Sequence, residues 1–141
     1  MCGFGGYFGQ VPDADALLRS MAGALRHRGP DAQGTMVLPH GGLAHARLSI
    51  VGLSDGQQPM RDESGDLAIA FNGEIFNYVE LREELKSKGH RFRTSSDTEV
   101  ILHLYREVGE DCVDRLNGDF AFAIWDARQQ SMMLARDRMG V

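Results

Sequence analysis

The spacing of apolar residues along the chain predicts short strands separated by three amphipathic helices. Short apolar or alternating runs bounded by turn residues are typical of strands, whereas apolar positions three and four apart are typical of helices. Strands are expected over residues 2–9, 34–38, 43–50, 67–71, 120–125 and 132–135. Helices are expected over residues 13–27, 77–89 and 96–108.

Local signals mark the ends of these helices. The Gly-Pro pair at 29–30 stops the first helix, and Asn77 begins the second, which Gly89 ends. Ser96 and Glu99 match a capping box at the start of the third helix. In that motif the serine side chain accepts from the glutamate N–H, and the glutamate side chain reaches back to the serine N–H.

Two pairs of expected strands are joined by short connections, at 39–42 and 127–130. Such connections join antiparallel neighbours, because a crossover between parallel strands needs a dozen or more residues. We therefore expect an α+β fold in which helices cover antiparallel sheets. Two apolar stripes are expected in its core: Leu17, Met21 and Leu25, and Phe120, Phe122 and Ile124.

Composition narrows the class of protein. The chain has 141 residues, enough for one domain, and its 43% hydrophobic and 25% charged content is that of a globular protein. A net charge of −5 without a run of Lys or Arg argues against nucleic acid or an anionic membrane surface as a partner. We find no apolar stretch of transmembrane length, no export signal and no disulfide framework, so we expect a cytoplasmic protein.

No cofactor or metal motif stands out. The glycines at 3, 5, 6 and 9 fail the dinucleotide-binding fingerprint, because Phe8 occupies its last position and the run lies within a strand. No Gly-Lys-Ser/Thr phosphate loop is present, and the five histidines lack metal-ligand spacing. We therefore expect no cofactor and no metal in this chain.

Cys2 is the candidate nucleophile. Removal of Met1 would leave a thiol and a free α-amino group on one residue. The ordinary pKa of an α-amino group is about 7.7–8.0 and that of a thiol about 8.5, so the amine can take the thiol proton near neutral pH, through a water. A cysteine at position 2 is more often an incidental residue, so the catalytic interpretation needs support from the rest of the chain.

That support comes from motifs that follow Cys2 in a fixed order. They occupy residues 1–3, 26–31, 45–50, 58–60, 72–77, 96–101, 118–123 and 136–140. With them the chain resembles the class II (N-terminal-nucleophile) glutamine amidotransferases, and within these the glutaminase domain of asparagine synthetases. Each block is weak alone, but their joint order is specific. The resemblance implies a four-layer αββα sandwich and hydrolysis of glutamine through a Cys2 thioester.

The resemblance also implies how glutamine is bound. Arg47 matches the arginine that holds the α-carboxylate, and Asp97 matches the residue that receives the α-ammonium group. Glu74 belongs to the same pocket, and Ile50 and Val51 are expected to supply backbone contacts. Without the resemblance, Arg47 would be interpreted as a surface arginine and Asp97 as a first-turn aspartate that the helix dipole stabilises.

Asn72 and Gly73 match the family's oxyanion hole, the first through its side-chain amide and the second through its backbone N–H. Alone they would be interpreted as a turn that ends a strand. The residues 28–30 are expected to shape the loop beside the site. Two positions depart from the family, where isoleucine is common at Phe4 and tyrosine at Phe76. The second change removes a hydroxyl beside the oxyanion hole.

The resemblance implies that residues 1–141 are an incomplete glutaminase domain that lacks C-terminal elements. A synthetase domain, absent from this chain, would bind ATP and magnesium and use the ammonia to make asparagine, in an enzyme that could be a homodimer. Residues 46–50 favour this branch over those making amino sugars or purine precursors. A specialised acceptor, a non-catalytic module and an inert fragment remain alternatives.

Overall fold

The computed structural model describes residues 2–49 and 55–141, which contain two antiparallel sheets. The three-stranded sheet has the order β1 (Gly3–Phe8), β3 (Gly41–Arg47) and β2 (Ala32–Leu38). The four-stranded sheet has the order β4 (Met60–Arg61), β5 (Leu67–Ile75), β6 (Gly118–Asp126) and β7 (Ser131–Arg136). The helices are α1 (Ala14–Ala24), α2 (Tyr78–Ser87), α3 (Asp97–Val108) and the short 3-10 helix η1 (Gly109–Arg115).

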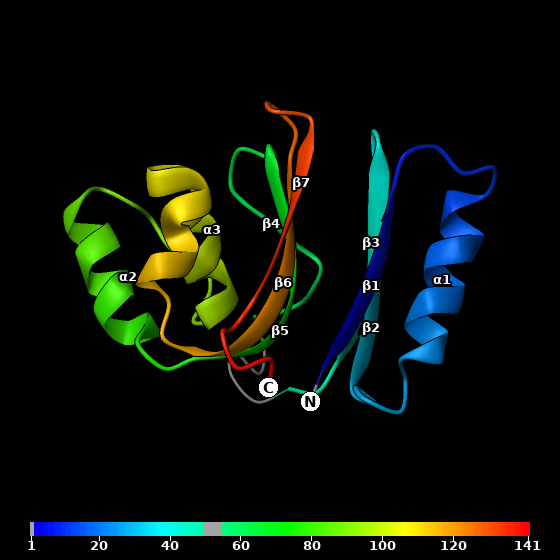
Figure 1. Cartoon of the computed structure of the whole chain (residues 1–141), viewed down its shortest axis with the longest axis horizontal. Coiled ribbons are helices and arrows are strands. Elements are labelled where there is room, and N and C mark those ends of the chain that lie inside the picture. Colours follow the sequence, from blue (N-terminus) through cyan, green and yellow to red (C-terminus); the bar gives the residue numbers. More distant parts are fainter. Residues whose placement is uncertain (1, 50–54) are drawn as a thin grey trace.

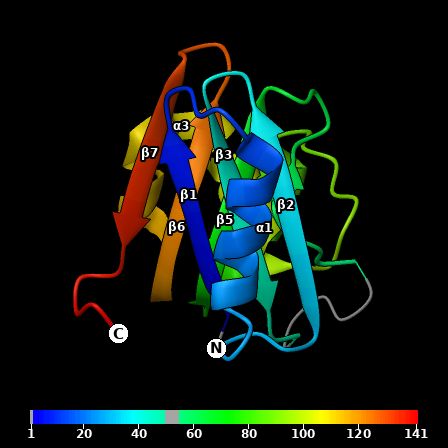
Figure 2. The same cartoon turned by 90° about the vertical axis from the view of Figure 1, so that its right-hand side faces the viewer.

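The elements stack in four layers, which confirms the expected αββα sandwich. Helix α1 covers the outer face of the three-stranded sheet, whereas α2 and α3 cover the outer face of the four-stranded sheet (Figure 1). Figure 2 shows α1 lying across β1, β3 and β2. The beginning of β1 and the end of the chain lie at the same end of the sandwich (Figure 1).

Each interface between layers has its own apolar cluster. The largest joins α2 and α3 to their sheet, and it includes the expected stripe Phe120, Phe122 and Ile124. The expected stripe on α1 is only partly in the core, although Met21 packs against the cluster that contains Leu18 and Ala22. Leu18 and Ala22 are the fully buried residues of this helix, and Leu17, Met21 and Leu25 are only half-buried. Periodicity gives the width of an apolar face, but the tilt of the helix on its sheet decides which residues are deepest.

Two elements were not expected, and one strand is longer than its apolar run. The unexpected elements are β4, which has two residues, and η1. Strand β5 was expected over 67–71 but continues to Ile75, because β6 pairs with it as far as Gly118. The extension has a polar sequence, so no apolar pattern marked it. It carries three of the predicted site residues: Asn72, Gly73 and Glu74.

The starts of α2 and α3 use their polar side chains differently from what the sequence predicted. The Ser96 side chain accepts from the N–H of Glu99, but the Glu99 carboxylate bonds Arg93 and Thr94 rather than Ser96. The expected capping box is therefore only half formed. Asn77 makes no cap bond to α2 and instead holds the loop before β6 by accepting from the N–H of Asn117.

Candidate active site

The candidate site lies at one end of the space between the two sheets. Apolar side chains fill most of this space, among them Leu43 and Trp125. Where β1 begins and β3 ends, the lining becomes polar around a cavity of about 160 Å3. All predicted site residues that the structure describes line this cavity: Cys2, Arg47, Asn72, Gly73, Glu74 and Asp97. Ile50 and Val51 lie outside the described residues.

Cys2 directly precedes β1 and lies beside the end of β3. Its Sγ is 3.2 Å from the backbone N of Leu48 and 3.3 Å from the Leu48 carbonyl oxygen, so the thiol can both accept and donate here. Arg28 Nε donates to the Cys2 carbonyl at 3.1 Å, which ties the loop after α1 to the candidate nucleophile. Cys112 differs, because burial and the charge of Asp111 raise the pKa of its thiol to about 12 and leave it unreactive.

Charged groups of both signs surround the cavity. Arg47 and Asp97 are buried, with 7% and 4% of their surface exposed, while Glu74 and Asp119 are exposed. Burial raises the pKa of Asp97, and the charge of Glu74 raises it further. A cation between these two carboxylates would stabilise both in their ionised form. The cavity therefore offers a cation-binding and an anion-binding wall, as a zwitterionic amino acid requires.

The extended part of β5 supplies Asn72, Gly73 and Glu74 to the lining of the cavity. Successive side chains of a strand point to opposite faces, so Asn72 shares with Ala68 and Ala70 the face that looks toward the other sheet. Its Oδ1 atom is buried and has no hydrogen-bond partner within the described part of the chain. A buried side-chain amide that is not fully bonded is costly unless a ligand or water completes it, which fits a ligand-binding position.

Gly73 has to be a glycine. Its φ of 140° lies in the region that side chains rarely adopt. A Cβ atom there would lie 2.1 Å from the carbonyl oxygen of Asp119, on the neighbouring strand β6. The position thus allows close approach of backbone groups, as an oxyanion hole built from a backbone N–H needs.

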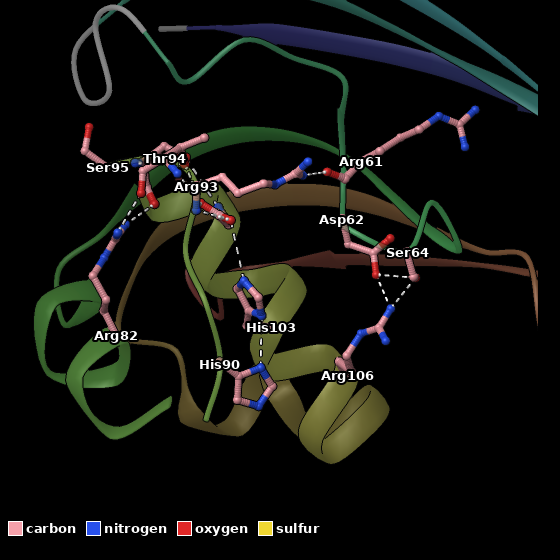
Figure 3. Close-up of polar contacts among 12 residues, drawn as sticks. Arg61, Asp62, Ser64, Arg82, His90, Arg93, Thr94, Ser95, His103 and Arg106 are labelled. Atoms are coloured by element: carbon pink, nitrogen blue, oxygen red, sulfur yellow. Dashed lines mark hydrogen bonds and ion pairs between the residues drawn. The ribbon is translucent and has the colours of Figure 1, made fainter. Parts of the chain in front are cut away.

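Two helices hold the loop that leads into Asp97. The carboxylate of Glu99, on α3, accepts from the backbone N–H and from the hydroxyl of Thr94, each at 2.7 Å. From the opposite side Arg82, on α2, donates to the Thr94 carbonyl at 2.7 Å (Figure 3). The position of Asp97 therefore depends on polar contacts behind the cavity as well as on those within it.

Sequence reasoning missed three polar residues of the cavity wall. Gln58, Thr98 and Asp119 line the cavity, and Gln58 Nε2 lies 3.4 Å from Thr98 Oγ1. Each stands within a motif of the resemblance, which was the one available signal. Phe76, the position that departs from the family, also lines the cavity and is 54% exposed.

Within residues 2–49 and 55–141 no group of three or more His, Cys, Asp or Glu side chains is arranged to hold a metal ion. No helix of this same part of the chain is both long and apolar enough to cross a membrane.

Known proteins resemble this chain in sequence. A family model described as "Glutamine amidotransferase domain" matches residues 1–141. The glutamine-hydrolyzing asparagine synthetase 1 of Bacillus subtilis (strain 168) is 44% identical over 146 residues, which are 100% of this chain and 23% of the relative. The glutamine-hydrolyzing asparagine synthetase 3 of Arabidopsis thaliana is 46% identical, over 100% of this chain and 25% of the relative. The chain thus spans about a quarter of the length of these relatives.

Solved structures resemble it in fold. Glutamine phosphoribosylpyrophosphate amidotransferase from B. subtilis, complexed with ADP and GMP, aligns with a TM-score of 0.75 over 99% of this chain and 38% of its own. A structure described as the allosteric regulatory enzyme of purine biosynthesis aligns with a TM-score of 0.77 over 97% of this chain and 37% of its own. Both are 24% identical to this chain, so they establish its fold alone. The family model, which matches residues 1–141, shows that this chain belongs to the glutamine amidotransferase domain family.

Proposed function

We propose that this chain hydrolyses the side-chain amide of glutamine to glutamate and ammonia, with Cys2 as nucleophile. The proposal rests on one observation: residues from four separate parts of the sequence line one cavity. They are Cys2, Arg47, Asn72, Gly73 and Asp97. Their chemistry matches the three polar ends of glutamine: an α-carboxylate, an α-ammonium group and an amide.

The proposed reaction begins once Met1 has been removed. The α-amino group of Cys2 takes the thiol proton through a water, and the thiolate attacks the amide carbon of glutamine. Asn72 and the N–H of Gly73 stabilise the negative oxygen of the tetrahedral intermediate. The ammonium group returns the proton to the leaving nitrogen, which departs as ammonia. Water then attacks the Cys2 thioester and releases glutamate.

Substrate recognition in this proposal is electrostatic. The Arg47 guanidinium binds the α-carboxylate through two parallel hydrogen bonds, which its planar shape allows. Asp97 and Glu74 bind the α-ammonium group. The positive charge of this group counteracts the effect of burial and of Glu74, and so lowers the pKa of Asp97 when glutamine is bound. Backbone groups of Ile50 and Val51 complete the contacts.

The names of the relatives suggest the purpose of the ammonia. We propose that it serves asparagine synthesis from aspartate in a longer, cytoplasmic enzyme whose synthetase part binds ATP and magnesium, and which could be a homodimer. The alternative is an amidotransferase of the same branch with a specialised acceptor, because the acceptor is chosen outside residues 1–141.

The test is glutamate release from glutamine by the purified chain and by its Cys2→Ala variant. Hydrolysis that requires Cys2, together with an intact mass that lacks Met1, would support the proposal. An active protein that retains Met1 would refute the role of the α-amino group. Glutamine binding without hydrolysis, unaffected by Cys2→Ala, would favour the inert or non-catalytic alternative.

A further inference from the structure

Two side chains that the proposed chemistry does not use hold the residue next to Asn72. Gln58 Oε1 accepts a hydrogen bond from the backbone N–H of Phe71 at 2.6 Å. His45 Nε2, from the other sheet, donates to the carbonyl oxygen of Phe71 at 2.9 Å. Both backbone groups of Phe71 are therefore bonded to side chains and not to a neighbouring strand.

These side chains replace a strand partner before β4 begins at Met60. In an antiparallel strand the backbone groups of alternate residues point to the same edge. On the β4 edge of β5, Ile69 pairs with Met60 of β4. Phe71, two residues further along this edge, is bonded to the side chains of Gln58 and His45 instead. Further along the same edge, the N–H of Ile75 donates to the Asp97 carboxylate at 3.0 Å.

Gly73 lies between Phe71 and Ile75 on this edge. Opposite it, Phe120 turns both backbone groups toward Asp137 on the β7 side, so the Gly73 N–H is not bonded to β6, and it has no other partner within residues 2–49 and 55–141. Side chains thus fix the strand on both sides of this N–H and leave it available to a ligand.

The histidine is suited to a permanent structural bond. Because the Phe71 carbonyl can only accept, His45 must carry its proton on Nε2, and its other ring nitrogen, Nδ1, has no partner in the described chain. Burial lowers the pKa of His45, and the charge of Arg47 lowers it further. The ring is therefore neutral, and His45 is a poor candidate for an acid or base in the reaction.

We propose that Gln58 and His45 are positioning residues of the oxyanion hole: by clamping the peptide groups of Phe71 they fix the orientation of the Asn72 amide and the Gly73 N–H. The proposal rests on the proposed hydrolysis of glutamine. Oxyanion donors must be held within about 0.5 Å of their productive positions, which an edge strand without a neighbour would not ensure. Gln58 also lines the cavity, so direct contact with the substrate is the competing explanation.

The test compares variants that remove each clamp with variants that keep it. Gln58→Met removes the acceptor at similar size, whereas Gln58→Glu keeps an acceptor oxygen. His45→Leu removes the donor, whereas His45→Gln keeps a nitrogen donor at similar reach. We expect Gln58→Met and His45→Leu to lower kcat by about 10-fold to 10²-fold, less than loss of a donor itself, with KM changed less than about 3-fold.

Gln58→Glu and His45→Gln should recover most of the lost kcat. As a second readout, glutamate γ-semialdehyde forms a tetrahedral adduct with Cys2 whose oxygen occupies the oxyanion hole. In Gln58→Met and His45→Leu, the affinity for this aldehyde should fall in parallel with kcat. The affinity for glutamine, measured with Cys2→Ala added to each variant, should not fall.

Asp126→Ala is the matched control for lost stability. Asp126 caps the β6–β7 turn by accepting from the N–H groups of Arg128 and Gln129, at the end of β6 opposite to the site. The proposal is overturned if this control lowers kcat as much as Gln58→Met at equal loss of Tm. A rise in KM alone or an unchanged kcat in Gln58→Met also overturns it. If the unmodified chain neither hydrolyses glutamine nor binds the aldehyde, the proposed function itself fails, and this inference fails with it.

Discussion

Glu99→Gln tests how far contacts behind the cavity stabilise the protein. Glu99 is 3% exposed, and its carboxylate accepts from the N–H of Arg93 at 2.9 Å and from the N–H and hydroxyl of Thr94, each at 2.7 Å. His103 Nε2 lies 3.5 Å away on the same helix. Glutamine has a single acceptor oxygen, so in the variant its NH2 group would face N–H donors in place of the second oxygen.

The expected cost follows from the pKa of Glu99. Burial alone would raise this pKa, but hydrogen bonds from His103, Arg93 and Thr94 outweigh burial and lower it from 4.5 to about 2. A difference of this size corresponds to about 3 kcal/mol of folding free energy at neutral pH. Because the folded-state pKa is depressed, this contribution is present in full above pH 4.5 and disappears as the pH falls toward 2.

Urea unfolding of the parent and of Glu99→Gln at a series of pH values measures this contribution. We expect the free energy of unfolding of the variant to be about 3 kcal/mol lower than that of the parent at pH 7. Near pH 3 this difference in unfolding free energy should narrow to about 1 kcal/mol. Glu83→Gln is the control, since among the described residues Glu83 pairs only with Lys86, on an exposed face of α2, and the substitution should change stability by less than about 0.5 kcal/mol. A difference between parent and Glu99→Gln that is the same at pH 7 and pH 3 would refute the assigned pKa.

Three further outcomes are expected. Cys2→Ala should abolish glutamate release while leaving glutamine binding measurable by calorimetry, and Cys2→Ser should also fail, because a hydroxyl is a much weaker nucleophile at neutral pH. Arg47→Lys should raise KM more than it lowers kcat, because lysine keeps the charge but cannot form two parallel hydrogen bonds. Asn72→Ala should lower kcat by about 10²–10³-fold with little change in KM. If steady-state kinetics showed only KM effects in both variants, the oxyanion role of Asn72 would be excluded. We expect the chain to self-associate through β7, because this strand pairs only with β6 in the described chain and carries Leu134, which is 72% exposed. Leu134→Lys should reduce that self-association in sedimentation experiments, and unchanged association would show that the β7 edge is not responsible.

Local sequence pattern determined the kinds of elements and the antiparallel connections of this chain. Helix α3 was expected over 96–108 and is found at Asp97–Val108, because a polar cap and a three- to four-residue apolar period act within a few residues of each other. The candidate nucleophile was also visible, since the thiol and the amine that would activate it belong to the same residue. The roles of Arg47 and Asp97, in contrast, came from the resemblance, because nothing local distinguishes them from surface charges.

Only the tertiary structure decided how the site is built. Cys2 and Leu48 meet because β1 and β3 pair in one register, and Asn72 faces them because β6 extends β5 beyond its apolar run. The clamp of Phe71 by Gln58 and His45 joins residues 13 and 26 positions apart. Each of these contacts depends on sheet register and on the stacking of two sheets. Such long-range pairings are set by the fit of whole faces, which no period within a single segment encodes.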